Sequence, residues 1–393
     1  MRLLFVHDHR FYQYHSGEVY TSGSLPAETW DRYLAHFDSV HVVGRDGGPL
    51  PADANYALSS RPGVTFDLIP NVSYRELVLG SKALRDRIRS NVGASDAAVL
   101  RLPSELGFMA AAQCRKVGKP YAVEMVGCAW DAMRNHGSWS AWLYAPLMYL
   151  RTRRALREAP LSLYVTSRWL QRRYPTRGKA YSASDVEIVP MSEAELRSRK
   201  ARLGRVAKGQ PPELGTVASL RIRSKGVQTA LAALEALRKE GLELRYRVLG
   251  GGDASPWIAL AERHGVADLV SFDGVRPAGE GVRLWIDTID IHLQPSFQEG
   301  LPRATVEAMS RGAACIGSTC GGIPELLPPD RLHEPGDVAG LARRIRVLAT
   351  NPVVLAKASA RDLETASAFR PERLASIRSE FLEDLRAAAA KKA

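Results

Sequence analysis

Two glutamates, Glu299 and Glu307, lie in the part of the sequence that is richest in residues able to bind a ligand. Residues 289–326 read as strand, loop, helix, strand, glycine turn and helix. Pro302 suits the first turn of the helix, and Gly312 suits the cap that ends it. A carboxylate at the helix mouth and another two turns inside could accept hydrogen bonds from two parts of one polyhydroxylated ligand. An isolated pair at this spacing more often complements the helix dipole or faces solvent, but its surroundings here favour binding.

The two helix starts in this stretch each follow a buried strand. The first strand covers 289–293 and the second 313–317, and the second leads through Gly321 and Gly322 into Ile323. If the strands are parallel, both helices open at the carboxyl edge of one sheet. Ligands of α/β folds bind at that edge, where free helical N–H groups favour anions and hydroxyl groups.

The stretch from Pro295 to Pro302, together with Glu307-Ala-Met and Gly321-Gly-Ile-Pro-Glu, resembles a known motif. It is similar to the donor-sugar motif of retaining family-4 glycosyltransferases, and the resemblance extends more weakly over residues 214–350. The resemblance implies an α/β, GT-B fold with two Rossmann-like doubly wound domains facing an interdomain cleft. It also implies donor contacts from Glu299, Gly300, Leu301 and Pro302, with Glu307 at the ribose.

Two further loops carry the expected donor site. Lys225 and Gly226 follow the strand predicted at 215–220, where a basic loop before a helix suits a diphosphate. We expect Lys225 to act with Glu299 in catalysis, because a departing diphosphate needs positive charge. The family's arginine position holds Ser219 or Leu220, so either Arg221 or Arg223 could supply the second charge. The resemblance adds Gly251, in the glycine turn 250–253, and Val275, beside the expected base.

The composition indicates a globular enzyme of two domains. The chain has 393 residues, 45% of them hydrophobic and 24% charged. No apolar run approaches the roughly 18 residues of a membrane helix, and no signal-peptide pattern is present at the N-terminus. The four cysteines lack metal-ligand spacing and indicate reduced, cytoplasmic thiols. No D-x-D carboxylate pair is present, so we predict a reaction without metal or other cofactor, with the nucleotide-sugar as co-substrate.

The first half of the sequence alternates strands and helices, as a parallel doubly wound sheet requires. We predict an acceptor-binding domain at 1–192, a linker at 193–213 and a nucleotide-sugar domain at 214–370. A helix at 371–393 is expected to cross back to the first domain. Predicted strands of the first half cover 2–7, 40–45, 64–69, 97–102, 120–127, 161–166 and 186–190.

Polar residues at predicted strand ends and loops of the first domain are candidate acceptor contacts. Arg101 and Glu124 lie in apolar strands, where a buried carboxylate must be paired. Asp131 and His136 follow nearby. For these four residues, binding and structural roles remain equally open. Gly23 is a candidate phosphate contact of the donor, and it could equally serve only to turn the chain.

Residues 151–208 are strongly basic, within a chain of net charge +12. Aromatic residues are interleaved with the arginines, so an anionic membrane surface or a lipid-diphosphate-linked acceptor is an expected partner. No nucleic-acid-binding module is present, and we expect no nucleic-acid partner. The predicted function is transfer of a sugar, with retention, to a glycan or lipid-linked acceptor at the inner face of the membrane. A nucleotide-sugar epimerase, a glycosyl phosphorylase and a non-catalytic anionic-surface binder remain alternatives.

Overall fold

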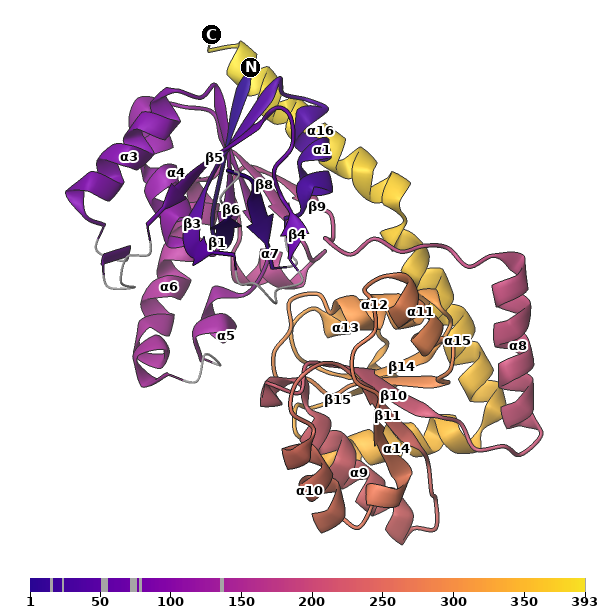
Figure 1. The fold of residues 1–393 in the computed structure, drawn as a ribbon. Helices are drawn as coiled ribbons and strands as arrows, with labels where there is room; N and C mark the ends of the chain where they lie inside the picture. The colour runs from indigo at the N-terminus through magenta and orange to yellow at the C-terminus, as the bar shows by residue number, and fades with distance from the viewer. Residues whose placement is uncertain are drawn as a thin grey trace. The chain divides into compact units, whose positions relative to one another are not determined.

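The computed structural model describes residues 1–14, 17–22, 25–50, 56–70, 76–77, 80–134 and 138–392. The chain divides into unit 1, Met1–Ala183 with Ala375–Ala393, and unit 2, Ser184–Leu374. Figure 1 shows a separate sheet with its own helices in each unit. Two predicted contacts, Gly23 and His136, lie outside the described residues.

Unit 1 is built on a sheet that is parallel at its centre. Its parallel strands lie in the order β5-β3-β1-β6-β7-β8-β9, and β2 and β4 extend it by antiparallel pairing. The central strands are apolar along their length because helices cover both faces. The strands are β1 (Arg2–Gln13), β2 (Val19–Thr21), β3 (Ser39–Pro49), β4 (Ala57–Leu58), β5 (Val64–Ile69), β6 (Ala97–Leu102), β7 (Tyr121–Met125), β8 (Leu161–Tyr164) and β9 (Lys179–Ser182).

The two faces of this sheet bury different sets of helices. Leu4 and Val6 of β1 belong to the core beneath α3 and α4, whereas Phe5 packs edge-on against Trp30 and Tyr33 on the other face. The helices are α1 (Asp31–Leu34), α3 (Lys82–Gly93), α4 (Glu105–Val117), α5 (Ala129–Arg134), α6 (Trp139–Glu158) and α7 (Trp169–Arg173), with the short 3₁₀ helix η1 (Ala27–Trp30).

The C-terminal helix α16 (Pro371–Ala390) belongs to unit 1 from Ala375 onward. Lys179 of β9 forms ion pairs with its Glu380 and Asp384, at 2.9 and 2.8 Å. Beside them the ring of Phe381 packs edge-on against Tyr181, at 5.6 Å between centroids. A buried aromatic contact rimmed by ion pairs therefore attaches this helix to the edge strand.

Unit 2 has a wholly parallel sheet in the order β12-β11-β10-β13-β14-β15. The chain thus builds outward from β10 in one direction and then, from β13, in the other. The point between β10 and β13, where the order reverses, is where doubly wound folds bind ligands. The strands are β10 (Leu214–Val217), β11 (Tyr246–Leu249), β12 (Val270–Phe272), β13 (Ile291–Gln294), β14 (Ala314–Ser318) and β15 (Leu332–His333).

Helices cover both faces of this second sheet as well. Ala314 and Ile316 belong to the core with α9 and α14, while Cys315 between them belongs to the core with α12 and α13. The helices are α8 (Glu193–Ala207), α9 (Val227–Lys239), α10 (Ser255–Arg263), α11 (Glu280–Ile286), α12 (Arg303–Ser310), α13 (Ile323–Leu326), α14 (Val338–Thr350) and α15 (Pro352–Ala366). The 3₁₀ helices are η2 (Arg223–Lys225), η3 (Ala267–Leu269), η4 (Pro329–Arg331) and η5 (Ser367–Phe369). In the part of the chain that the structure describes, none of the helices combines the length and apolarity that a membrane crossing requires.

One predicted strand near the division between the units differs from the structure. Residues 186–190 form no strand; Val186 and Ile188 are instead buried in the core of unit 2, and Ile188 N–H donates to Phe369 O. The predicted linker at 193–213 begins with α8, a helix of unit 2 whose Arg199 donates to Ile286 O and Ile289 O. The alternating apolar residues of 186–190 pack on the core of unit 2, and charged residues of α8 hydrogen-bond to it.

Candidate active site

The loops after β10 and β13 meet at the point where the strand order of unit 2 reverses. Phe297 N–H donates to Ser224 O at 2.7 Å and joins the two loops. Gly226 has φ +78°, and a Cβ there would lie 1.9 Å from Pro295 O, so only glycine allows this approach. The result is an ion pair between Lys225 Nζ and Glu299 Oε1, 2.7 Å apart.

Three donors converge on one oxygen of Glu299. Besides Lys225, Ser296 Oγ donates to Oε1 at 2.7 Å and Gln294 Nε2 donates at 2.9 Å. The second oxygen, Oε2, accepts no hydrogen bond from any described residue and is not a buried atom. The side chain is 8% exposed, yet its carboxylate is fixed in direction and keeps one oxygen able to accept a hydrogen bond.

The direction of Gln294 is set from behind. Its Oε1 accepts from Thr305 Oγ1 and faces His292 Nε2 at 3.1 Å, so the imidazole must carry its proton on Nε2. Burial lowers the pKa of His292 to about 4 and keeps the ring neutral. Because the Glu299 carboxylate accepts hydrogen bonds, the amide turns its Nε2 toward Glu299, which leaves Oε1 to accept from Thr305 and His292.

The glycine turn after β14 supports the same loop from the other side. Ser318 Oγ donates to Ser296 O at 2.6 Å, and Gly322 N–H donates to Gly300 O at 2.7 Å. Gly321 has φ +60°, and a Cβ there would lie 2.2 Å from Glu299 O. The start of α12 and the start of α13 are therefore held together, as the sequence predicts for two helices opening at one sheet edge.

Glu307 lies inside α12 and is more solvent-accessible than Glu299. Its side chain is 20% exposed, and the nearest cation, Arg303 Nη1, is 4.0 Å from Oε1. Burial raises the pKa of the Glu307 carboxyl, and Arg303 and Arg283 offset only part of that rise. Among the described residues, this partly buried carboxylate has no partner closer than Arg303, which suits a group that meets a ligand.

The glycine turn after β11 contacts the basic loop. Leu220 N–H donates to Gly251 O at 2.9 Å, and a Cβ on Gly251 would lie 3.1 Å from the exposed Val275. Arg223 lies over the ring of Trp257, at 5.8 Å from its centroid, whereas Arg221 is exposed and has no ion-pair partner among the described residues. Of the two candidates for the second positive charge, this arrangement favours Arg221.

Comparisons with known proteins identify the family of this chain. Residues 211–351 match the family described as "Glycosyl transferases group 1". Protein CapJ of Staphylococcus aureus is 30% identical over 351 residues, which cover 88% of this chain and 85% of CapJ. The chain belongs to the group 1 glycosyltransferases.

One further relative and one solved structure are similar to this glycosyltransferase. The putative colanic acid biosynthesis glycosyltransferase WcaL of Escherichia coli is 34% identical over 152 residues, 35% of this chain and 36% of WcaL. The structure of Anabaena Alr3699/HepE in complex with UDP superposes with a TM-score of 0.66 at 17% identity, covering 98% of this chain and 100% of that one. The predicted GT-B fold, with two Rossmann-like units, is confirmed.

Two candidate acceptor residues of the glycosyltransferase, Arg101 and Glu124, lie near the carboxyl ends of β6 and β7 in unit 1, and a third, Asp131, lies in α5. Glu124 accepts from Tyr33 OH at 2.8 Å on one oxygen and from Arg101 Nη1 at 3.2 Å on the other. Asp131 lies 3.3 Å from Arg173. The first pair is buried and satisfies the carboxylate that the sequence places in an apolar strand. An acceptor role for these residues stays a prediction.

Some site residues are absent from the sequence-based set. Gln294 ends an apolar strand, and a polar side chain at that place was a usable signal. Asp8 ends the apolar run of β1 in the same way, and its carboxylate accepts from the N–H groups of Glu105 and Leu106 at the start of α4. Gln294 holds the Glu299 side chain and Asp8 holds the start of α4, through hydrogen bonds that no sequence spacing reveals.

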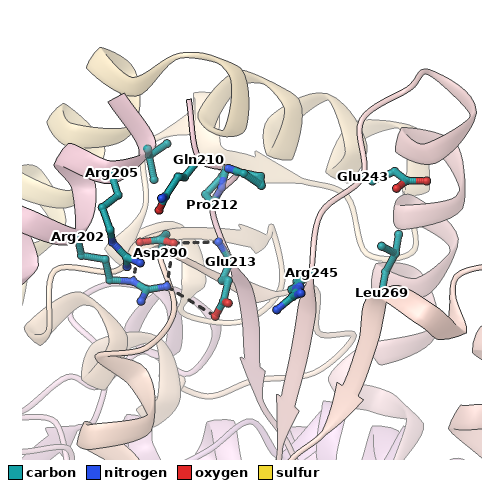
Figure 2. A pocket seen from close by; sticks show the side chains of 11 residues that line it. Arg202, Arg205, Gln210, Pro212, Glu213, Glu243, Arg245, Leu269 and Asp290 are labelled. Carbon is teal, nitrogen blue, oxygen red and sulfur yellow. Dashed lines mark hydrogen bonds and ion pairs between the residues drawn. The ribbon is translucent and has the colours of Figure 1, made fainter. Parts of the chain in front are cut away.

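A separate cavity of about 400 Å³ lies at the amino edge of the sheet in unit 2. Figure 2 shows Arg202 and Arg205 of α8 on one side of it and Arg245 on another. Arg202 pairs with Asp290 at 2.7 Å and with Glu213 at 3.6 Å, directly before β13 and β10. These ion pairs fix α8 to the sheet, at the edge opposite the one where α/β folds bind ligands.

Proposed function

We propose that this protein is a retaining, metal-independent family-4 glycosyltransferase with an E-x7-E motif formed by Glu299 and Glu307. It transfers a sugar from a nucleotide-diphosphate sugar to a glycan or a lipid-diphosphate-linked acceptor in polysaccharide or glycolipid biosynthesis. Unit 2 binds the donor and unit 1 the acceptor. The family assignment of the chain, the colanic acid function named for WcaL and the UDP complex of HepE support this donor and setting.

One observation carries the proposal: the Glu299 carboxylate is held on one oxygen by three donors and keeps the other available. The free oxygen accepts a hydrogen bond from a hydroxyl of the transferred sugar. Positive charge develops on that sugar as its bond to the diphosphate breaks. A fixed carboxylate needs no reorganisation at that moment, so its interaction strengthens in the transition state. The fold alone would support many other functions, and this side-chain arrangement is the observation that supports the proposed chemistry.

Lys225 binds the diphosphate that leaves in the reaction. Its ammonium has three N–H donors, of which Glu299 takes one, so two remain for the diphosphate. Arg221 and the glycine turn around Gly251 complete the phosphate side, with Val275 beside the base. The bond between the anomeric carbon and the phosphate oxygen breaks, and that oxygen takes the proton of the acceptor hydroxyl attacking from the same face. Configuration is thereby retained without a covalent enzyme intermediate.

The test is a panel of nucleotide-diphosphate sugars assayed by thermal shift in the presence of EDTA. The true donor should raise the melting temperature in a concentration-dependent way, because it binds only the folded state. With that donor and candidate acceptors, NMR of the product should show the anomeric configuration of the donor. Conversion of the donor to a different nucleotide-sugar would identify an epimerase instead. Transfer to inorganic phosphate would identify a phosphorylase, and inverted product would reject retention.

A further inference from the structure

Helix α6 carries an exposed apolar stripe along its first three turns. Its buried face, with Ala141, Ala145 and Met148, packs into unit 1. The exposed residues recur at intervals of three and four, which places them on one face. They are Trp139 (78% exposed), Trp142 (49%), Leu143 (59%), Leu147 (48%) and Leu150 (60%). No other described helix or strand has more than one exposed large hydrophobic side chain. The clustering of such side chains on one face is therefore particular to α6 among the described elements.

The same face becomes basic over the last turns of the helix. A cavity of about 550 Å³ follows Leu150 and is lined by four arginines and one glutamate: Arg153, Arg154, Arg157, Arg177 and Glu158. Glu158 is already paired with Arg154 at 2.9 Å and with Arg115 at 3.1 Å. Among the described residues, neither Arg157 nor Arg177 has an ion-pair partner. The cavity therefore offers uncompensated positive charge beside an apolar surface.

A further cation lies at the apolar end of this surface. Arg134 of α5 lies over the ring of Trp142, 4.7 Å from its centroid, and over Trp130 at 5.5 Å. Indole rings next to guanidinium groups suit the boundary of a bilayer, where rings lie at headgroup depth and cations meet phosphates. From Trp139 to Leu150 the stripe spans only about 16 Å at 1.5 Å per residue, so the helix would lie in the membrane plane.

We propose that this face of α6 docks the protein on an anionic phospholipid bilayer. The tryptophans and leucines enter the headgroup boundary, and lipid phosphates occupy the arginine-lined cavity. Charge complementarity selects this occupant, because a second copy of a chain with net charge +12 would bring like charge to the same place. The inference does not depend on the proposed transfer reaction, since it concerns a surface of unit 1 and can be tested without donor.

The docking surface also sharpens the sequence-based expectation for residues 151–208. Arg199 and Arg202, within that basic run, are committed to contacts inside unit 2. Arg151 is committed to Glu105, at 2.7 Å. The proposed surface instead combines the apolar residues before position 151 with Arg153, Arg157 and Arg177.

The experiment is co-sedimentation of the full chain with vesicles of phosphatidylcholine, alone or with phosphatidylglycerol. One variant carries Trp139→Gln, Leu143→Gln and Leu147→Gln, and a second carries Arg153→Gln, Arg157→Gln and Arg177→Gln. Matched controls are Val347→Gln with Val353→Gln, which are exposed on α14 and α15, and Arg205→Gln with Arg245→Gln, which are exposed in unit 2. All substituted side chains are exposed, so each variant should keep the melting temperature of the wild type.

We expect the wild type to partition onto anionic vesicles about tenfold or more above neutral ones, and both α6-face variants to lose about tenfold or more. The controls should bind as the wild type does. Added salt should weaken the wild type strongly and the arginine variant little. Equal partition onto neutral and anionic vesicles, or undiminished binding by either variant, would overturn the proposal. So would a dimer in light scattering that the leucine and tryptophan substitutions dissociate, because the face would then join two copies.

Discussion

The carboxyl edges of the two sheets hold similar ion pairs that differ in how they are built. Both sheets grow outward from a central pair of parallel strands, and each has a cation and a glutamate where neighbouring strands end. In unit 1, Arg101 is 3.2 Å from Glu124; in unit 2, Lys225 is 2.7 Å from Glu299. The comparison contrasts a carboxylate whose two oxygens both accept hydrogen bonds from the protein with one that keeps an oxygen available to a ligand.

The difference lies in the second carboxylate oxygen. Glu124 is part of β7, and both of its oxygens are used, one by Tyr33 and one by Arg101. Glu299 follows the end of β13 in a loop, and all three of its donors share Oε1. A carboxylate inside a strand must be fully satisfied by the protein, whereas one beyond the strand end can be fixed through one oxygen and bind through the other.

Replacing each glutamate with glutamine should separate the two edges most strongly. Glu299→Gln should lower kcat by about 10- to 100-fold, the range for losing a charged hydrogen bond in the transition state, with little change in donor affinity. Glu124→Gln should instead lower the free energy of unfolding by about 3 kcal/mol, because it removes the negative charge from a largely buried ion pair. Steady-state kinetics and denaturant melts of both variants measure the two effects.

The opposite pattern would reverse this assignment. If Glu124→Gln lost activity while keeping full stability, and Glu299→Gln lost stability alone, the reacting edge would be that of unit 1. Full activity in both glutamate variants of unit 2, Glu299→Gln and Glu307→Gln, would remove the transferase proposal itself.

Lys225→Ala should give the next largest effect, on donor binding. Loss of one charged phosphate contact corresponds to about 1.5–3 kcal/mol, or roughly 10- to 150-fold in Kd. The fold should persist, since Glu299 keeps the donors Gln294 and Ser296. Calorimetry with the donor found in the screen measures the change, and Arg223→Ala is the matched control, because that guanidinium lies over Trp257. An unaltered Kd in Lys225→Ala would remove this lysine from the site.

Ser296→Ala should have a smaller effect that tests the positioning of Glu299. It removes one of three donors on Oε1, worth about 0.5–1.5 kcal/mol, so kcat should fall about 2- to 10-fold while the donor Kd stays constant. Ser296→Thr retains the hydroxyl and should recover part of the loss. A change in Kd with constant kcat would show that the serine contacts the donor rather than the glutamate.

The helices and strands around the candidate site follow largely from local sequence. The contacts between them depend on which strands are neighbours in the sheet. Apolar runs bounded by glycine and proline predict β13, β14 and the start of α12, and the structure confirms all three. The ion pair between Lys225 and Glu299 joins residues 74 positions apart and exists only because β10 lies beside β13. Residues 186–190 were wrongly predicted as a strand, because alternating apolar side chains also suit an extended connector packed on a core. The pairing of Glu124 was expected in kind, but its partners Tyr33 and Arg101 come from other elements.

The smallest predicted effect concerns Glu307, whose buried position should cost stability when it is ionised. Burial raises the pKa of this carboxyl in the folded protein above its ordinary value. Below the ordinary pKa the carboxyl is neutral in both states and does not lower the free energy of unfolding. As pH rises from that value through the raised pKa of the folded protein, the free energy of unfolding falls. Glu307→Gln lacks the charge, so it should melt at a higher temperature than the wild type at pH 7, with the difference closing as pH falls below about 4.5.

The same substitution should raise both the KM and the Kd of the donor about 2- to 10-fold, the effect of one lost hydrogen bond to the ribose, with kcat nearly constant. Gaining stability while losing affinity is the pattern of a group kept for binding. A melting difference independent of pH would reject the role of ionisation. A loss confined to kcat would place Glu307 with Glu299 at the reacting bond and remove the division of roles between them.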